Sequence, residues 1–499
     1  MTIKKNTIIK VSIAHLFLFT YFFGFCGNKE ITRPLQKDKH ALAAYEAMLD
    51  LRLTEARTLL EHPKVESAHK QFSNSLADII EIIFKADQAT YDSLINNETV
   101  YLNNLSNLAK KDPHKLYYMS EVRIQWAVVK LMFSEEVKAG WSLKTAYGEI
   151  EDNIKRFPDF EPNYKALGSL KILFSAMPES YHWLLNLFGI DPNSHDGWKL
   201  INKISPKSPY YLETSIIKTL VSTNIIGDKE IALNEVKRMA KLYPKNQLST
   251  YFRGITLIKY AQSETALPLL QQTSNTDTSH VINHYSRYQL ASIYLQKQSY
   301  DSARLWFQNF LNEYTGTNLV KDSYFKIGVS HYLQKHTFRA MQYFSQARKE
   351  GSTKVEEDKN AFYLLIQNSY PPSSLLKIRY ATDGGYFDLA KRELENLNVN
   401  DFKSSKYKIE LQYRKARLFD KLGDIKNAIP FYEKTIELSG ENNWYFAPAS
   451  CLNLGKYYAS IEKYDLAKSY LKKVLSYKRH QYKAGLDNKA KVALQGLPK

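Results

Sequence analysis

The stretch LASIYLQKQSYDSARLWFQNFL (residues 290–311) is followed by IGVSHYLQKHTFRAMQYFSQA (residues 327–347), and both carry the same pattern. Each begins with a small residue, Ala291 or Gly328, and has an alanine twelve positions later. Small residues let two helices approach closely, and the aromatic residues that follow fill the gap to the next pair. The stretch therefore predicts helix–turn–helix units of about 34 residues, none of which buries its own apolar face.

The same pattern extends in both directions along the chain. Small residues and alanines in equivalent places are Ala232, Gly254, Ala266, Ala390, Ala416, Ala428, Gly455 and Ala467. The chain thus resembles tetratricopeptide repeat proteins, and no segment shows the alternating pattern of a strand. The resemblance implies an all-α solenoid of stacked antiparallel helix pairs that form a right-handed superhelix.

The apolar N-terminus, the prolines and glycines that break helices, and the regularity of the repeats divide the chain into five predicted parts. Residues 1–26 form an export signal and residues 27–39 a tether. Divergent helical repeats follow over residues 40–205, and regular repeats occupy a central tract over residues 206–350. A C-terminal tract, residues 351–499, ends in a basic, polar helix over residues 478–494, which is the cap that a solenoid needs.

One block in the divergent part has a further resemblance. Its residues are Gly168, Phe174, Ser175, Met177, Pro178, Leu184, Leu185, Phe188, Gly189, Asp196 and Gly197. The block is similar to the family of tetratricopeptide repeat protein 39 and the yeast inclusion-body-clearance protein. That resemblance implies architecture and little about function.

The N-terminus has the layout of an export signal. Lys4, Lys5 and Lys10 precede an apolar run over residues 11–25, and Cys26 follows it. Three interpretations stay open: Cys26 becomes the lipidated first residue of a lipoprotein, the chain is exported in soluble form, or the segment stays as an anchor. A spanning helix needs about 20 apolar residues, more than this run has. We expect an exported protein of the periplasm or outer membrane.

The chain is strongly basic, with a formal net charge of +18. Nine Lys and Arg residues face a single Asp over residues 468–499. Such an excess is compatible with an acidic partner or with a lysine-rich solvated surface. We expect a protein or peptide partner, with membrane attachment open through Cys26 or the basic C-terminal helix, and no nucleic acid.

The sequence carries no strong catalytic motif. It lacks a nucleophile elbow, a P-loop and a dinucleotide fingerprint, and its two cysteines make no metal site. We therefore expect no catalytic residue, no metal and no cofactor. Neighbouring acidic residues at 135–136, 149–152 and 356–358 leave one alternative, a helical enzyme acting on carbohydrate or peptidoglycan through paired carboxylates.

The function that these features favour is a non-enzymatic scaffold of the cell envelope. Its concave groove, lined by the first helices of the repeats, would hold a protein or peptide. The residues expected to contact the partner are Tyr251, Arg253, Tyr288, Tyr294, Lys326, Tyr413, Trp444 and Tyr457. Association with a lipid or membrane surface is the other alternative.

Overall fold

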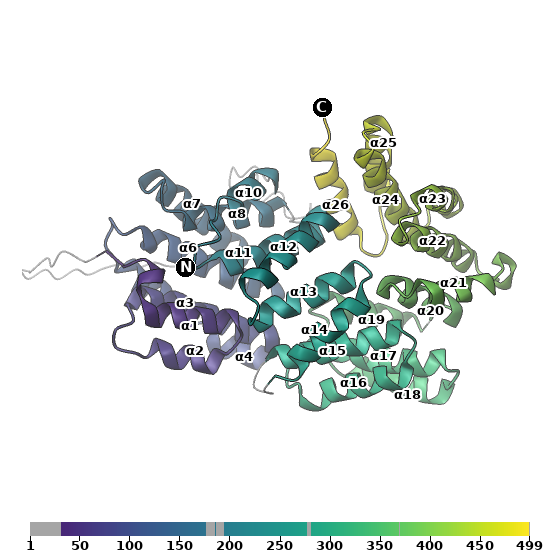
Figure 1. The fold of residues 1–499 in the computed structure, drawn as a ribbon, viewed down its shortest axis with the longest axis horizontal. Helices are drawn as coiled ribbons and strands as arrows, with labels where there is room; N and C mark the ends of the chain where they lie inside the picture. Colours follow the sequence, from purple (N-terminus) through teal and green to yellow (C-terminus); the bar gives the residue numbers. More distant parts are fainter. Residues whose placement is uncertain (1–30, 176–184, 186–193, 277–280, 369, 499) are drawn as a thin grey trace, which may run out of the picture.

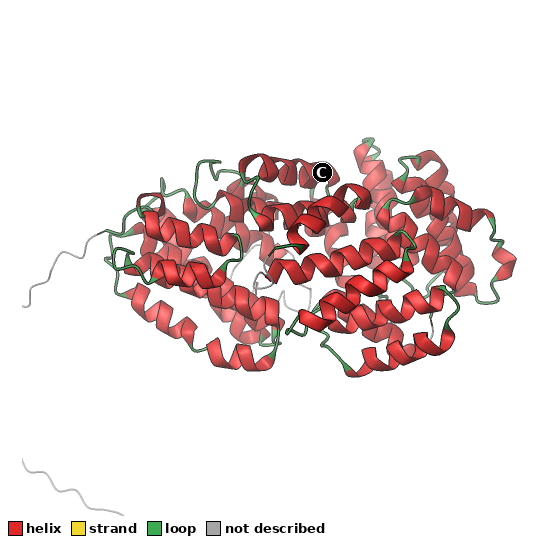
Figure 2. Ribbon diagram, turned by 60° about the horizontal axis from the view of Figure 1, so that its bottom comes forward, coloured by secondary structure: helices red, strands yellow, loops and turns green. Residues whose placement is uncertain are grey.

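The computed structural model describes residues 31–175, 185, 194–276, 281–368 and 370–498. Every regular element in those residues is a helix, and no strand occurs among them (Figure 2). Neighbouring helices lie in antiparallel pairs, and the pairs stack along the chain (Figure 1). The predicted all-α solenoid is thereby confirmed, whereas the expected export signal lies outside the described residues.

The helices fall into three successive groups. The N-terminal layer contains η1 (Leu35–Lys37), α1 (Lys39–Leu49), α2 (Leu53–Leu60), α3 (Ser67–Lys85), α4 (Gln88–Leu94), α5 (Asn97–Ser106), α6 (Pro113–Met132), α7 (Glu136–Arg156), α8 (Pro162–Ser175) and α10 (Ser194–Ile201). The central tract contains α11 (Tyr211–Val221), η3 (Ser222–Ile226), α12 (Lys229–Leu242), α13 (Gln247–Lys259), α14 (Ser263–Ser274), α15 (Val281–Gln296), α16 (Tyr300–Glu313), α17 (Val320–Leu333) and α18 (Thr337–Lys349). The C-terminal tract contains α19 (Glu356–Gln367), α20 (Ser373–Gly384), α21 (Phe387–Glu395), η4 (Val399–Asp401), α22 (Ser405–Lys421), α23 (Ile425–Ser439), α24 (Phe446–Ser460), α25 (Tyr464–Ser476) and α26 (Lys483–Gln495).

The first helix of a pair ends in a repeated backbone motif. After α15, Gln298 takes the left-handed conformation, and the amide of Ser299 returns to the carbonyl of Tyr294 at 2.9 Å. This arrangement satisfies carbonyls that would otherwise lack a partner at the helix end. The left-handed residues at such turns are Leu51, Ser134, Ala261, Gln298, Lys335, Gly385, Gly423 and Glu462. Because only two of these eight residues are glycine, the positions of the turns are difficult to recognise in the sequence.

Small residues hold the two helices of a pair together. A Cβ atom on Gly328 of α17 would lie 2.6 Å from the ring of Phe344 on α18. One on Gly455 of α24 would lie 2.7 Å from the side chain of Leu471 on α25. Both glycines occupy the position that the repeat pattern assigns to a small residue, so the predicted reason for that position is confirmed.

The solenoid folds back so that the N-terminal layer packs on the central tract. The backbone carbonyls at the C-terminal end of α3 accept hydrogen bonds from side chains in the loops beside α17. Asn318 donates to Ile83 at 3.0 Å, and Lys354 donates to Ala86 at 2.7 Å. Another contact joins the end of α1 to the start of α13, where Asn246 donates to the carbonyl of Leu49 at 3.1 Å.

The C-terminal tract also returns to an earlier part of the chain. Lys456 of α24 donates to the carbonyls of Ile226 and Gly227, at 2.9 and 3.2 Å, beside η3. Helix α26 packs on α24, on α25 and on η3. The last helix therefore joins two parts of the solenoid rather than only covering its end.

Substitution by alanine is expected to destabilise the protein at a glycine that contacts the partner helix and to stabilise it at a glycine that has no such contact. Gly328→Ala forces a Cβ against Phe344, and overpacking of this kind costs about 1–3 kcal/mol. Gly148→Ala, on α7, meets no atom within 4 Å and is expected to stabilise the helix by about 0.5–1 kcal/mol. Urea unfolding of both variants checks the prediction, and equal effects would contradict it.

Candidate functional site

A cavity of about 890 Å³ lies beside the first helices of the C-terminal pairs. Residues of α20, α22 and α24 form one side, and α19, the loop before α26 and α26 itself form others. Lys259, the last residue of α13, reaches the same space. The cavity thus exists because the C-terminal cap is folded back over the groove, toward the central tract.

The lining of this cavity is predominantly basic, and we call it the basic cavity. Its acidic side chains are Glu356 and Asp383. Its basic side chains include Lys259, Lys359, Arg379, Arg414, Arg417 and Lys489, which come from five helices. Another lysine of the lining, Lys483, pairs with Asp487 at 2.6 Å.

Three arginines at one end share two carboxylates. Arg414 is 5% exposed and donates to Glu410 at 2.6 Å, one helical turn away. Arg417 donates to Asp383 at 3.0 Å, and Arg379 lies 3.8 Å from the same carboxylate. Although burial raises the pKa of Asp383, the guanidinium groups of Arg417, Arg379 and Arg414 outweigh it and lower that pKa. This end therefore keeps an excess of positive charge.

Tyrosine rings surround these arginines. Tyr445 accepts a hydrogen bond from Arg414 at 3.1 Å, and its ring lies edge-on to Tyr482, with the centroids 5.1 Å apart. Tyr413 lies edge-on to Tyr445 at 5.6 Å. Aromatic faces beside guanidinium groups offer both stacking and charge to a bound chain. We call this part of the basic cavity the arginine end.

Beyond Arg417, the basic cavity also brings lysines together. Burial, together with the charges of Lys259, Lys456 and Arg417, lowers the pKa of Lys489 to about 8. Burial and the charge of Arg417 likewise lower the pKa of Lys421 to about 8. Like charges thus crowd one another where α13, α22, α24 and α26 meet, and we call this part the lysine end.

Of the residues predicted to contact a partner, Tyr413 lines the basic cavity. Tyr251 and Tyr288 are buried, and the hydroxyl of Tyr288 donates to Asp322 and accepts from Lys326. The other predicted residues, Arg253, Tyr294, Trp444 and Tyr457, are half-buried. The role of these residues in binding stays a prediction.

Sequence reasoning missed Arg379, Arg414 and Arg417 as site residues. Arg414 and Arg417 lie on the first helix of a repeat, and their spacing of three residues places them on one face. That spacing could have identified Arg414 and Arg417 as a pair from the sequence. Their proximity to Arg379 and Lys489 could not have been predicted, because it depends on contacts between helices that are not neighbours in the chain.

The acidic clusters expected for the enzyme alternative have structural partners. Glu149 accepts from Arg123 at 3.1 Å, and burial raises the pKa of this carboxyl. Asp358 accepts the amides of Leu319 and Asp322 at 2.7 and 2.8 Å, at the start of α17. Within the residues that the structure describes, no group of three or more His, Cys, Asp or Glu side chains is placed to hold a metal ion.

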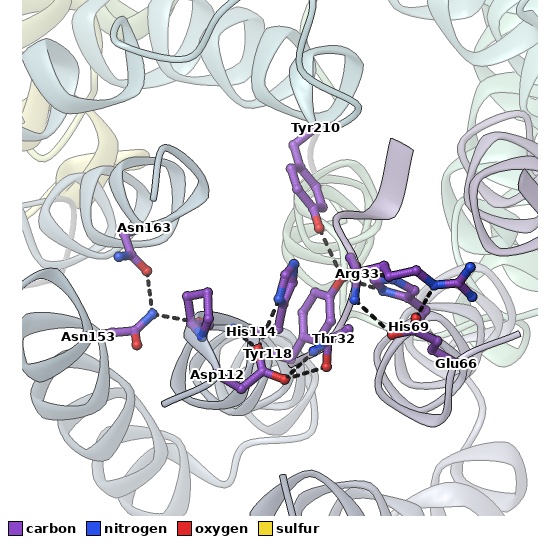
Figure 3. Close-up of polar contacts among 11 residues, drawn as sticks. Thr32, Arg33, Glu66, His69, Asp112, His114, Tyr118, Asn153, Asn163 and Tyr210 are labelled. Atoms are coloured by element: carbon purple, nitrogen blue, oxygen red, sulfur yellow. Dashed lines mark hydrogen bonds and ion pairs between the residues drawn. The ribbon is translucent and has the colours of Figure 1, made fainter. Parts of the chain in front are cut away.

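A second cluster of titratable groups lies in the N-terminal layer (Figure 3). Asp112 accepts from the amide of Thr32 at 2.8 Å, and Glu66 accepts from the amide of Arg33 at 2.9 Å. Leu35 is buried in the core of this layer. The distal part of the predicted tether is thus packed against α3 and α6.

His69 fixes the direction of the hydrogen bonds in this cluster (Figure 3). Its Nε2 lies 3.0 Å from the carbonyl of Arg33, which can only accept, so Nε2 carries the proton. In the neutral ring, Nδ1 then accepts from Tyr118 at 2.8 Å, and Tyr118 in turn accepts from Tyr210 at 3.0 Å. Burial lowers the pKa of His69 to about 4, which keeps the ring neutral at pH 7.

Protonation of His69 is expected to destabilise the fold in mild acid. Its ordinary pKa of 6.5 falls to about 4 on folding, so the unfolded state binds more protons between these values and stability falls as pH drops below 6.5. Between pH 7.5 and 5.0 the wild type should lose about 2 kcal/mol more than His69→Gln. Urea unfolding at the two pH values measures this difference.

The variant is the necessary reference in that experiment. Burial raises the pKa of Glu121 to about 7, so this carboxyl stabilises the fold as pH falls through the same range. It is present in both proteins and cancels in the comparison. Equal pH dependence of wild type and His69→Gln would contradict the assignment of a neutral, buried His69.

Family models for the tetratricopeptide repeat match residues 322–350, 409–442 and 448–481. These segments coincide with the pairs α17–α18, α22–α23 and α24–α25. No curated protein matches the sequence. The similarity of residues 168–197 to the tetratricopeptide repeat protein 39 family stays a prediction, and much of that block lies outside the described residues.

Several solved helical structures align over much of the chain. The apo quorum sensor NprR from B. thuringiensis is 14% identical, over 81% of this chain and 99% of its own, with a TM-score of 0.32. A human IFIT1 dimer with m7Gppp-AAAA is 12% identical, over 94% of each chain, with a TM-score of 0.34. The APC/C hetero-tetramer Cut9–Hcn1 is 13% identical, over 92% of this chain and 96% of its own, with a TM-score of 0.28.

These TM-scores are too low for us to base any conclusion on the alignments. The assignment depends instead on the three matched segments and on the helix pairs that they form, each closed by a left-handed turn. The chain contains tetratricopeptide repeats over residues 322–350, 409–442 and 448–481.

Proposed function

We propose that this protein is a non-enzymatic scaffold that binds an acidic segment of a partner protein in the basic cavity. The observation that carries the proposal is the arginine end, where, among the residues that the structure describes, the ion pairs of Arg379, Arg414 and Arg417 are with Glu410 and Asp383 alone. Guanidinium groups bind carboxylates through paired hydrogen bonds, and tyrosines beside them supply apolar contact area. An extended acidic peptide is therefore the ligand that fits this end best.

The chemistry of the site favours binding over catalysis. Asp383 is held as a carboxylate by its arginine neighbours, which removes it as a proton donor near neutral pH. Glycoside hydrolysis requires one carboxyl group whose pKa is raised and a second that stays ionised. The arginine end instead opposes protonation of its carboxylate, so we place the enzyme alternative second.

We further propose that the protein is exported and attached to the cell envelope through Cys26. Five residues separate Cys26 from Thr32, which is bound to Asp112. A chain of that length spans at most about 20 Å, so a lipid on Cys26 would keep the N-terminal layer close to the membrane. No helix within the described part of the chain has the length and apolar character needed to cross a membrane.

The basic C-terminal helix supports membrane attachment less well. Lys483 of α26 donates to Asp487 and to the carbonyl of Tyr477, at 2.6 and 2.9 Å. Lys489 lines the basic cavity. Lysines that already bond to groups of the protein, or that face its cavity, contribute less to binding an anionic membrane surface.

Peptide binding is expected to depend on the arginine end. A short fluorescent Glu-rich peptide should bind the wild type, and a Gln-rich peptide of the same length should not. Arg379→Gln should weaken binding by about tenfold or more, since a charge-assisted hydrogen bond contributes about 1.5–3 kcal/mol. Fluorescence anisotropy at two salt concentrations measures the effect, which should diminish at high salt.

Lys472→Gln is the matched control for that measurement. Lys472 is exposed on α25 and does not line the basic cavity. Its loss removes the same net charge without touching the arginine end, so binding should be unchanged. An equal loss in both variants would indicate attraction by net charge alone and would overturn the proposed site.

Attachment through Cys26 is tested by partitioning native membranes into Triton X-114. The wild type should enter the detergent phase, whereas Cys26→Ser should remain in the aqueous phase, because the variant lacks the thiol that carries the lipid. Metabolic labelling with a fatty acid provides a second readout. A wild-type protein that carries no label and stays in the cytosol would contradict export.

A further inference from the structure

The lysine end of the basic cavity has a charge arrangement that the proposed peptide does not explain. Lys259, Arg417, Lys456 and Lys489 come from four different helices, α13, α22, α24 and α26. Lys456 is engaged by the carbonyls of Ile226 and Gly227. Within the described part of the chain, the side chains of Lys259 and Lys489 form no hydrogen bond and no ion pair.

Carboxylates near the lysine end are committed to other groups. Asp383 accepts from Arg417, and Asp420 accepts from the hydroxyl of Tyr432 at 2.7 Å. Asp228 caps α12 by accepting the amide of Ile231 at 3.0 Å. The fold therefore brings like charges together, from distant segments, beside a cavity whose acidic lining within the described residues is limited to Glu356 and Asp383.

Such an arrangement is destabilising unless an anion neutralises it. Two unit charges a few ångströms apart repel by several kcal/mol when they are partly removed from water. Lys489, on α26, is repelled by the neighbouring Lys259, Lys456 and Arg417, and α26 also forms a wall of the cavity. An anion bound between Lys489 and Lys259 would relieve the repulsion and hold α26 against the central tract.

We propose that the lysine end is a binding site for the phosphoryl group of a small phosphorylated anion. Lys259 from α13 and Lys489 from α26 contact it, and Arg417 adds a third positive charge. Lysine binds phosphate as a point charge, whereas carboxylate recognition favours the planar fork of arginine, which the arginine end already provides. A phosphoryl dianion also matches the charge of several converging cations better than a single carboxylate does.

This site goes beyond the proposed peptide binding and does not depend on it. The two ends share the basic cavity and Arg417, and they differ in their other residues, Arg379 and Arg414 for the peptide and Lys259 and Lys489 for the phosphoryl group. Variants of Lys489, which is not part of the arginine end, therefore test the lysine end. Loss of peptide binding in Arg379→Gln, described above, reports on the other end.

Binding at the lysine end should be accompanied by uptake of a proton. The pKa of Lys489 is about 8 in the free protein, so at pH 8 the amine is charged in only about half of the molecules. An adjacent dianion favours the charged form, and binding should then take up about half a proton. The charged groups that act on this lysine are Lys259, Lys456 and Arg417. Its neighbours Lys421 and Lys456 are in turn surrounded by Lys229, Asp228, Asp383 and Asp420.

The test is calorimetric titration of the full chain with sodium pyrophosphate at pH 8, in two buffers of different ionisation enthalpy. The wild type should bind, with a difference in heat between the buffers that corresponds to the proton taken up. Citrate serves as the comparison, because it is a multivalent anion with carboxylates only. Pyrophosphate should bind at least tenfold more tightly than citrate.

Variants of Lys489 separate the role of its charge from that of its proton. Lys489→Gln should weaken pyrophosphate binding by tenfold or more. Lys489→Arg should keep the affinity and abolish the proton uptake, because a guanidinium group stays charged at pH 8. Lys472→Gln is the control and should bind as the wild type does. Thermal unfolding of each variant verifies that α26 remains folded.

Three outcomes would overturn the proposal. Absence of pyrophosphate binding to the wild type would show that the lysine end is not an anion site. Citrate binding as tight as that of pyrophosphate would assign the site to carboxylates instead. An equal loss in Lys472→Gln and Lys489→Gln would show that the anion responds only to the net charge of the protein.

Discussion

Eight of the helix pairs that the structure describes depend on one residue held in the left-handed conformation. At Gln298, Lys335 and Glu462, this residue turns the chain so that the next amide closes onto the last turn of the first helix. The second helix must then run back along the first, where a small residue allows close approach. Non-glycine residues accept about 1–2 kcal/mol of strain in this conformation. The hydrogen bonds and apolar contacts of the finished pair offset that strain.

The ends of helices also hold distant layers together. The last carbonyls of a helix have no partner within it, and they remain available to other groups. At the end of α3 these acceptors are used by Asn318 and Lys354 of the loops beside α17. Next to η3 they are used by Lys456 of α24. The solenoid thereby folds back on itself through polar contacts to backbone, which require no complementary pattern in the sequence.

The basic cavity is a consequence of this folding back. An extended solenoid would leave Lys259 and Lys489 far apart, and each would be solvated separately. Packing of α26 on η3 brings them together beside the arginines of α22. Burial, together with the repulsion that results, lowers the pKa of Lys489 to about 8, and an anionic partner in the cavity would relieve that repulsion.

The 34-residue period determined the helix pairs, because a small residue at Gly328 or Gly455 and an apolar residue sixteen positions later are local features of the sequence. The all-α solenoid and the basic final helix were predictable for the same reason. Only the tertiary structure decided which side chains meet. Tyr288 has the sequence context of an exposed groove residue, yet it is buried against Asp322. Arg379, Arg417 and Lys489 converge from helices that do not follow one another in the chain, and a repeat pattern, which describes neighbours, contains no information about such contacts.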